Sequence, residues 1–330
     1  MTLKRTVLKA CSRLLPDLYR PPSSVLLPFA HIVTDNPASH VKYLYTIPSV
    51  AKFKSDLDFL CQQYRPLQIA DLEQLPRLRD NKASVRNFIL SIDDGMREVY
   101  DIIVPILRDK GLPAIFFLNS ATIDNKRLMW RHKVSLLIER SKQQPGRIPP
   151  QITLRRGESL DSKLSALQFA DEGILDDVAR FFGVDFEDYL RRAKPYLTSS
   201  QVVELSRAGF EIGAHSDSHP YFCEMAVEDQ KKQISTSVDF IRALGVPCRY
   251  FAFPFHDSGV PMSVFRYMRD LGLVLSFGTS EARLDSVAFS FQRFSIDARS
   301  DNPSIREILK ELSAKSLAHR LSRTEVIRRS

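Results

Sequence analysis

Two short polar clusters hold the residues of this chain whose types and spacing could do chemistry. Asp93 and Asp94 come directly after one apolar run, and His215 and His219 belong to a cluster that follows another. Carboxylates and imidazoles are ligands of divalent metal ions, provided that a rigid scaffold brings them to one point. The two clusters therefore predict a metal site if the fold places them side by side.

The sequence context of the clusters separates such a site from ordinary turns. Asp-Asp-Gly is by itself a common turn sequence, because Asp accepts backbone N–H groups and Gly adopts positive φ. A pair of histidines four residues apart is by itself more typical of a surface or a satisfied core. Here the clusters follow the strand-like runs 88–92 and 210–214, and α/β folds build their sites at the carboxyl ends of strands. The combination favours a functional site.

Apolar periodicity predicts strands and helices in alternation over most of the chain. The predicted strands are residues 25–33, 88–92, 114–118, 210–214, 250–253, 273–277 and 289–296. The predicted helices are residues 49–64, 96–110, 200–208, 227–244, 261–271 and 304–317. Repeated strand-helix units indicate a parallel sheet, and periodicity leaves open whether that sheet stays open or closes into a barrel.

Residues 119–199 interrupt this alternation. They contain a helical stretch that starts near Trp130, a loop with Pro and Gly at 145–150, and further helical segments. We expect a helical insertion at the edge of the site, and both a substrate-recognising lid and a packing pair of helices fit the pattern. Trp130, Arg131 and His132 are the residues of this insertion that we predict to contact a substrate.

The net charge of +8 is concentrated at the two ends of the chain. Residues 1–30 carry a net charge of +4, residues 314–330 carry another +4, and the body has 37 basic and 37 acidic residues. Basic ends could contact an anionic membrane surface or nucleic acid, and a solvated surface explains them as well. Nucleic acid is disfavoured, because the body contains no basic patch with interleaved aromatic residues.

The ends and the cysteines also bear on location. Charged residues and Pro16 interrupt the apolar positions of residues 1–24, so the segment lacks the continuous apolar region of a signal peptide. The four cysteines are scattered without a C-x-x-C pair, as in reduced cytoplasmic proteins. We expect a basic amphipathic segment at 1–24, a single domain at 25–312 and a basic tail at 313–330. The predicted location is cytoplasmic, with peripheral contact to the inner membrane face as an option.

Three motifs resemble those of the polysaccharide deacetylase family with the NodB-homology domain (carbohydrate esterase 4-like). Residues 91–95, Ser-Ile-Asp-Asp-Gly, are similar to its T-F-D-D-G motif, and residues 215–219, His-Ser-Asp-Ser-His, are similar to its H-S/T-x-x-H motif. Residues 251–256, Phe-Ala-Phe-Pro-Phe-His, are similar to the F-A-Y-P-Y-G version of its third motif. The resemblance covers about residues 25–300. It implies an α/β fold, namely the incomplete or distorted (β/α) barrel of that family.

The resemblance also implies roles for individual residues. Asp94, His215 and His219 would hold a divalent metal, most simply zinc, with other first-row divalent metals as alternatives. Asp93 would act as the general base toward the attacking water. The backbone N–H of Phe255, which follows the motif residue Pro254, would stabilise the oxyanion.

The chain departs from the family pattern at the residue that orients the base. Many members have an arginine two residues before the motif proline, and this chain has Ala252 there. Arg249 is near in sequence without matching the position. Arg293, in the last predicted strand, could hold charge at the site, and an ion pair at a strand end explains it equally well.

A second departure concerns the general acid. The late Leu-x-His motif that supplies it in the family has no counterpart after Phe289. His256 could substitute because it lies on a site loop, and His132 could enter from the insertion. His31, at the end of the first predicted strand, could line the same mouth as a supporting residue.

The leading hypothesis is a metal-dependent hydrolase that removes N-acetyl groups from an amino-sugar-containing glycan or glycan precursor and releases acetate. An O-acyl esterase or a non-sugar amidohydrolase could use the same site. Because the acid is not evident, a catalytically impaired protein that binds glycan and metal is a third option.

Overall fold

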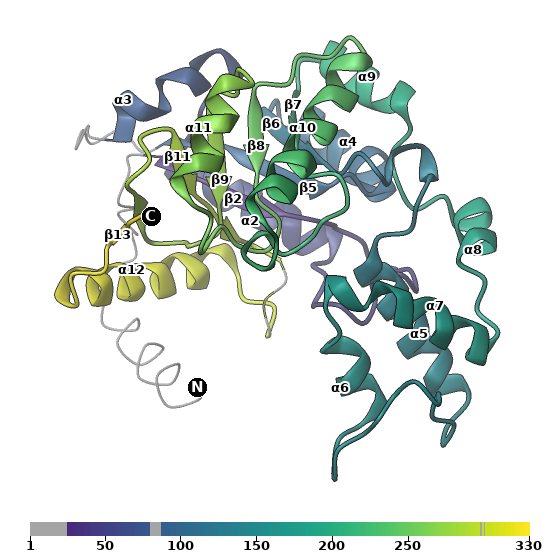
Figure 1. Ribbon diagram of the computed structural model, residues 1–330. Coiled ribbons are helices and arrows are strands. Elements are labelled where there is room, and N and C mark those ends of the chain that lie inside the picture. Colours follow the sequence, from purple (N-terminus) through teal and green to yellow (C-terminus); the bar gives the residue numbers. More distant parts are fainter. Residues whose placement is uncertain (1–24, 80–86, 298, 300) are drawn as a thin grey trace.

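The computed structural model describes residues 25–79, 87–297, 299 and 301–330. The predicted N-terminal segment at 1–24 lies outside these residues. Eight parallel strands form the main sheet, in the order β11-β9-β8-β7-β6-β5-β2-β12 (Figure 1). The strands are β2 (Pro28–Ala30), β5 (Leu90–Asp94), β6 (Ala114–Leu118), β7 (Glu211–Ala214), β8 (Tyr250–Ala252), β9 (Leu275–Gly278), β11 (Ser290–Gln292) and β12 (Phe294–Ser295).

The two ends of this order belong to one continuous segment of chain. Only Arg293 separates β11 from β12, so the segment pairs with β9 through its first half and with β2 through its second half. The N–H of Arg293 donates to the carbonyl of Gly278 at 2.9 Å, and the next N–H donates to the carbonyl of Leu27 at 3.1 Å. The sheet is thereby nearly closed into a barrel.

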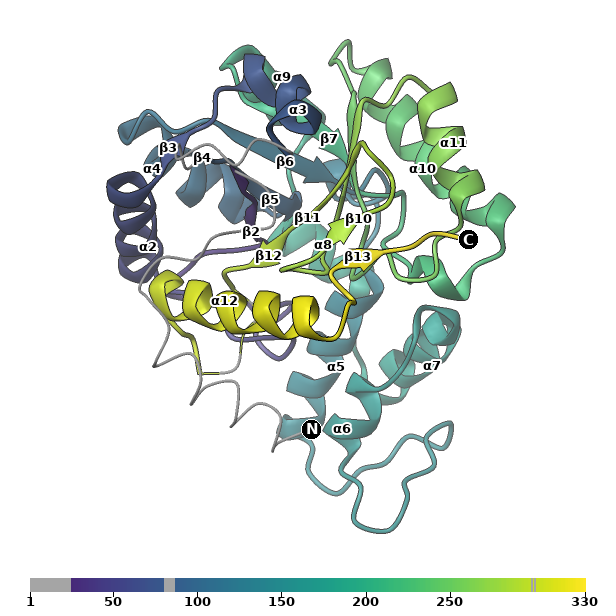
Figure 2. The same cartoon turned by 90° about the vertical axis from the view of Figure 1, so that its left-hand side faces the viewer.

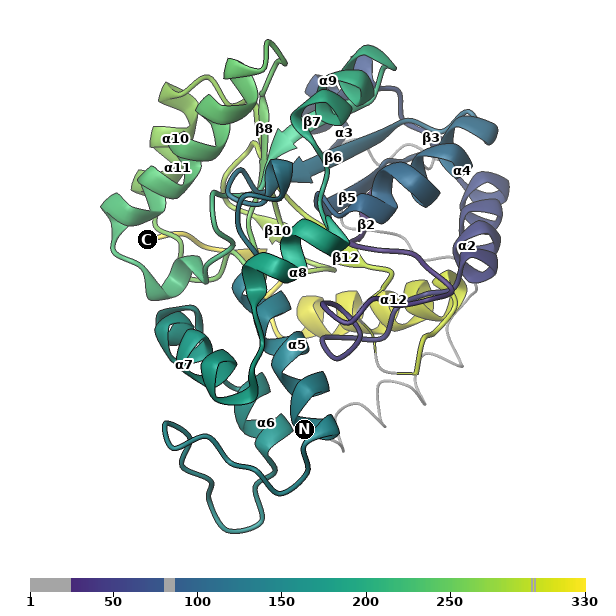
Figure 3. The same ribbon diagram turned by 90° about the vertical axis from the view of Figure 1, so that its right-hand side faces the viewer.

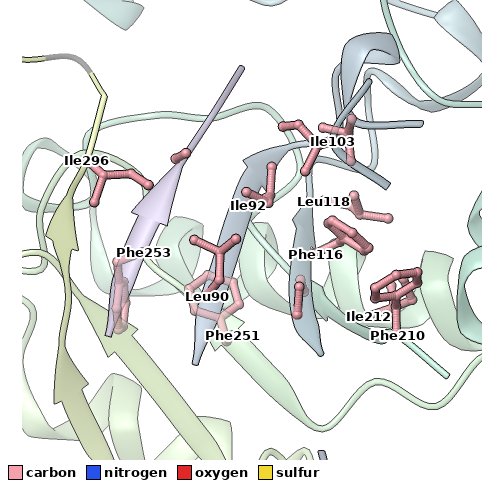
Figure 4. Packing of buried hydrophobic residues seen from close by; sticks show 14 of the residues in the cluster. Leu90, Ile92, Ile103, Phe116, Leu118, Phe210, Ile212, Phe251, Phe253 and Ile296 are labelled. Atoms are coloured by element: carbon pink, nitrogen blue, oxygen red, sulfur yellow. The ribbon is translucent and has the colours of Figure 1, made fainter. Parts of the chain in front are cut away.

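Strand alternation sorts the core into two layers. In β6, Phe116 and Leu118 belong to the cluster between the sheet and the helices, whereas Ile115 and Phe117 belong to the cluster inside the barrel. Figure 4 shows side chains of the first layer. Because the side chains of a strand alternate between its faces, the same parity that buries Ile92 under the helices directs Asp93 into the barrel.

Helices pack on the outside of the sheet (Figures 1 and 2). They are α2 (Val50–Gln63), α4 (Val104–Asp109), α9 (Ser199–Arg207), α10 (Val227–Ala243), α11 (Met262–Asp270) and α12 (Ile305–Leu321). The predicted helix 96–110 instead contains a π-helical turn at Val99–Ile103, before α4. Pro105 follows this turn without a backbone N–H to donate, which is a reason for the irregular bonding there.

The insertion forms a helical unit beside the barrel, with α5 (Trp130–Gln143), α6 (Leu160–Ser165), α7 (Glu172–Phe182) and α8 (Phe186–Ala193) (Figures 1 and 3). It has its own apolar cluster, in which Leu137, Leu164, Leu175 and Phe182 are fully or almost fully buried. The helices therefore pack chiefly on one another, and the start of α5 lies nearest the barrel site described below.

Shorter elements complete the fold. Strands β1 (Val25–Leu26), β4 (Asn87–Phe88) and β3 (Arg65–Pro66) form a small sheet, with α3 (Leu75–Arg79) nearby. The 3-10 helices are Ile69–Gln74, Ile123–Asn125, Phe169–Asp171 and Phe222–Glu224. Within the described parts of the chain, no helix is both long and apolar enough to span a bilayer.

The end of the chain differs from the predicted tail at 313–330. Helix α12 continues to Leu321, and β13 (Val326–Ile327) then pairs with β10 (Leu284–Asp285). Arg329 is almost fully buried and forms ion pairs with Asp257 and Asp285. Because two buried carboxylates need this cation, the last residues belong to the domain rather than to a solvated tail.

Candidate active site

The carboxyl ends of β5 and β7 bring the two polar clusters together. The Nε2 atom of His219 lies 3.3 Å from Oδ1 of Asp94, and the Nε2 atom of His215 lies 3.6 Å from the same oxygen. One ligand atom from each of the three residues can be chosen so that all lie within 4.8 Å of one another. All three side chains are buried. Two imidazoles and one carboxylate thus face a common point.

This arrangement fits a divalent cation. Oδ1 of Asp94 is buried and has no hydrogen-bond partner among the described residues. The Nδ1 atom of His215 contacts the carbonyl of Ala252 at 2.8 Å, which leaves Nε2 facing the carboxylate. Burial lowers the pKa of His215 to about 4 and the pKa of His219 well below its usual value. Both rings are therefore neutral near pH 7, as metal ligands must be.

The backbone at the site adopts conformations that are uncommon for residues other than glycine. Asp94, Ser216, His219 and Phe255 have φ values of 75°, 69°, 60° and 53°. Such left-handed conformations cost free energy and persist only where the surroundings enforce them, as they often do at functional sites. Four of them lie at the carboxyl ends of β5, β7 and β8, which marks this region as built for placing side chains.

The loop after β7 is held by side chains of its surroundings. The Oε1 atom of Gln233, on α10, accepts the N–H groups of Asp217 and Ser218, both at 3.0 Å. The hydroxyl oxygen of Ser216 accepts the N–H of His219 at 3.0 Å. These bonds fix the turn that returns His219 toward His215.

Asp93 points into the barrel and is clamped by Arg293. The guanidinium donates from Nη1 to Oδ1 at 2.7 Å and from Nη2 to Oδ2 at 2.9 Å, and it also donates to Ser91. Burial alone would raise the pKa of Asp93, but the charge and hydrogen bonds of Arg293 hold it below the usual value. Arg293 thus provides the kind of orienting contact that Ala252 cannot make.

His31 and Asp297 form a second ion pair at the site. Nδ1 of His31 lies 3.0 Å from Oδ1 of Asp297, and the N–H of His31 donates to Oδ2 at 2.6 Å. Burial alone would lower the pKa of His31, but Asp297 outweighs it and raises the pKa to about 10. Asp297 was not among the predicted site residues, although it follows the last strand as the other polar clusters follow theirs.

These groups share one pocket of about 250 Å³. It is lined by predicted site residues, namely His31, Asp93, Asp94, Arg131, His132, His215, His219 and Phe255. Sequence reasoning missed Tyr45, Met129 and Thr279, which also line it. Nothing in their sequence surroundings separates them from ordinary loop or core residues.

Five predicted site residues do not line the pocket. Arg293 is one of them, and it acts on the site through its ion pair with Asp93. Arg249 precedes β8, so it lies at the opposite end of that strand from the site, where it pairs with Glu73. Pro254 and His256 flank Phe255 without lining the pocket. Trp130 is buried without lining the pocket, and its Nε1–H donates to the carbonyl of His219 at 3.0 Å.

His132 lines the pocket but is unsuited to supply a proton. Its Nδ1 atom contacts the hydroxyl of Tyr196 at 2.6 Å, and the two rings stack. Burial lowers the pKa of His132 well below its usual value, and the neighbouring His40 lowers it further. The ring is therefore neutral near pH 7.

Comparisons with known proteins agree with the fold. The sequence matches the polysaccharide deacetylase family model over residues 80–275, more than half of the chain. No curated protein matches significantly. The chain is similar to the solved structure of the Streptococcus pyogenes deacetylase PplD in complex with acetate, with 13% identity, a TM-score of 0.52, and coverage of 91% of this chain and 98% of that one.

A second solved structure, IcaB from Ammonifex degensii, has 14% identity and a TM-score of 0.55, with coverage of 88% of this chain and 97% of that one. At these identities the likeness concerns the fold, and the predicted (β/α) barrel of the polysaccharide deacetylase type is confirmed. The chain belongs to the polysaccharide deacetylase family, and it is a hydrolase.

Proposed function

We propose that this enzyme removes N-acetyl groups from an amino-sugar-containing glycan or glycan precursor and releases acetate. The observation that carries the proposal is that one pocket contains both a candidate base and a candidate acid, each held by an ion pair. Asp93 is held as a carboxylate by Arg293, and His31 is held as an imidazolium by Asp297. Amide hydrolysis needs both, because a proton must leave the attacking water and another must reach the departing amine.

Asp94, His215 and His219 would hold the divalent cation. When bound, such a cation polarises the acyl oxygen and makes water a better nucleophile near neutral pH. Asp93 would accept the proton of the attacking water. The clamp from Arg293 costs Asp93 some basicity and in return fixes the direction of its carboxylate.

The backbone N–H of Phe255 would donate to the oxyanion that develops on the acyl carbon. The φ of 53° at Phe255 sets the direction of this peptide. The hydroxyl of Thr279 donates to the carbonyl of the same residue at 2.5 Å, which restrains the loop further. A fixed donor needs no reorganisation during the reaction.

His31 is the proposed general acid, in place of His256. It lines the pocket, whereas His256 does not, and the carboxylate of Asp297 keeps it charged at neutral pH. After His31 gives its proton to the leaving nitrogen, Asp297 orients the neutral ring for reprotonation. An acid at this position also removes the reason for expecting a catalytically impaired protein.

The experiment is acetate release from N-acetylglucosamine oligomers, O-acetylated glycans and simple amides. The proposal predicts turnover of the amino sugar and its loss in Asp93→Asn, with the bound cation retained. Turnover of esters or simple amides alone contradicts the substrate class, and full activity of Asp93→Asn contradicts the mechanism. Zinc as the cation, a cytoplasmic location and contact of the basic ends with anionic membranes stay predictions.

A further inference from the structure

One cationic side chain of the pocket has no counter-ion. Arg131 lines the pocket, and no carboxylate of the described residues lies within 4 Å of its guanidinium. Other buried arginines of the chain differ from it. Arg293 pairs with Asp93, Arg329 pairs with Asp257 and Asp285, and Arg299 pairs with two glutamates. The fold supplies acids to those cations and none to Arg131.

Arg131 is also held in position. Its Nη1 atom donates to the carbonyl of Ser165 at 3.0 Å, and its guanidinium lies 5.2 Å from the centre of the Trp130 ring. Trp130 is in turn fixed by its bond to His219. A guanidinium has five N–H donors, so most of them remain for a ligand. The cation is therefore preorganised beside the catalytic groups.

The partial burial of this charge has an energetic consequence. Burial lowers the pKa of Arg131, which reflects the cost of removing its charge from water. Arg293 recovers that cost through Asp93, but Arg131 has no such partner. An anion that enters the pocket with the substrate would recover it, and a guanidinium binds phosphate and carboxylate through paired hydrogen bonds.

The other charged residues of the pocket cannot serve an anion in the same way. His31 is bound to Asp297, and burial keeps His132 neutral. Arg293 does not line the pocket and is bound to Asp93. Among the described residues that line the pocket, this leaves Arg131 as the cation available to substrate. Arg131 lies on α5, apart from the catalytic residues of the barrel. This separation suits recognition of a second substituent on the sugar, because the acetylated nitrogen must lie at the barrel residues at the same time.

We propose that Arg131 binds an anionic group, a phosphate or a carboxylate, carried by the acetylated sugar, so that the enzyme prefers anionic to neutral amino sugars. This inference rests on the proposed deacetylase function. The reacting amide would lie against the catalytic residues of the barrel, and the anionic group would pair with Arg131 of the insertion. Loss of Arg131 should therefore weaken binding of anionic substrates and leave the chemical step unchanged.

The test compares wild type, Arg131→Gln and Arg131→Lys on N-acetylglucosamine, N-acetylglucosamine 1-phosphate and N-acetylmuramic acid. Arg131→Gln should raise KM about 10- to 100-fold for whichever anionic sugar the wild type prefers. Its kcat, and its kcat/KM for the neutral sugar, should stay within about twofold. Arg131→Lys should recover part of the loss, because lysine keeps the charge without the paired donors. The phosphate and carboxylate arms identify the anion.

The matched control is Arg127→Gln, which removes a nearby arginine that pairs with Glu172 and does not line the pocket. It should behave as wild type on all three sugars. Equal losses for neutral and anionic sugars in Arg131→Gln, or no loss at all, overturn the inference.

A binding measurement separates this inference from the proposed function. Calorimetry of the same sugars with Asp93→Asn and with Asp93→Asn/Arg131→Gln needs no turnover. A preference for the anionic sugar that disappears with Arg131 supports the inference even if no sugar is deacetylated. A preference that persists without Arg131 assigns the anion to the metal ligands instead and overturns it.

Discussion

The barrel edge and the helical insertion contribute to one pocket in different ways. Asp93, Asp94 and His215 lie on strand ends or directly after them, so strand register and parity place them. Arg131 and His132 lie on α5, and the packing of the insertion's own core places them. Under the two proposals above, the sheet would carry the chemistry and the insertion would carry recognition of the substrate. Barrel variants should therefore change kcat, and insertion variants should change KM.

The largest effect is expected at the proposed acid. His31→Gln should lower kcat about 10²- to 10⁴-fold, the usual contribution of a positioned acid or base. The matched control, His256→Gln, should stay within about twofold, because His256 does not line the pocket. Steady-state acetate release measures both variants. If His256→Gln lost more activity than His31→Gln, the general acid would instead be His256, on the loop after β8.

The barrel clamp should also dominate stability. Arg293→Met leaves Asp93 buried without its cation, and breaking such a pair costs about 3–5 kcal/mol. Arg249→Met breaks the half-exposed pair with Glu73, which water screens, so its effect should be close to zero. Chemical denaturation measures both changes. Similar losses in the two variants would mean that Arg293 is not held as its geometry indicates.

The pair of His31 and Asp297 predicts a pH dependence. Because the folded pKa of about 10 lies above the usual 6.5, the pair stabilises fully below about pH 6.5 and loses its effect as the pH rises through 10. The melting temperature of the wild type should therefore exceed that of Asp297→Asn. The difference should be largest near pH 6 and should shrink toward pH 10. A difference independent of pH would contradict a charged His31.

The smallest effect is expected where the insertion supports the barrel. Trp130→Phe removes the bond to the carbonyl of His219 and keeps most of the apolar packing. A lost hydrogen bond of this kind costs about 1 kcal/mol of stability, and a supporting contact of a metal ligand commonly changes affinity about 10-fold. Melting temperature and cation titration measure the two effects. Unchanged cation affinity would mean that the contact from Trp130 does not support His219 as a metal ligand.

The sequence predicted most of the barrel, because each long strand is an apolar run with a turn or a polar cluster behind it. Leu90 and Phe116 are examples, since both belong to predicted strands and are buried in the structure. The meeting of the two polar clusters could be predicted because the carboxyl ends of parallel strands share one edge. The choice of Asp94 rather than Asp93 as a metal ligand came from the family resemblance. Membership in the deacetylase family followed from the same motifs.

Other parts of the site depend on contacts that local sequence does not contain. The partnership of His31 with Asp297 spans 266 positions and exists only because β12 closes the barrel against β2. Arg293 reaches Asp93 because both point inward, which periodicity alone could not decide while the sheet might have been open. Trp130 was predicted to contact substrate, but it packs against the loop of His219 instead. An aromatic residue at the start of a helix predicts burial, but it does not predict which residues or ligand will cover it.

The central claim is tested most directly by the cation content of purified variants. Elemental analysis should find one equivalent of a divalent metal in the wild type and in Asp93→Asn. It should find none in Asp94→Asn or His215→Ala, since each of these variants lacks a ligand. Stoichiometric metal in both ligand variants, or none in the wild type after loading with zinc, would contradict the account.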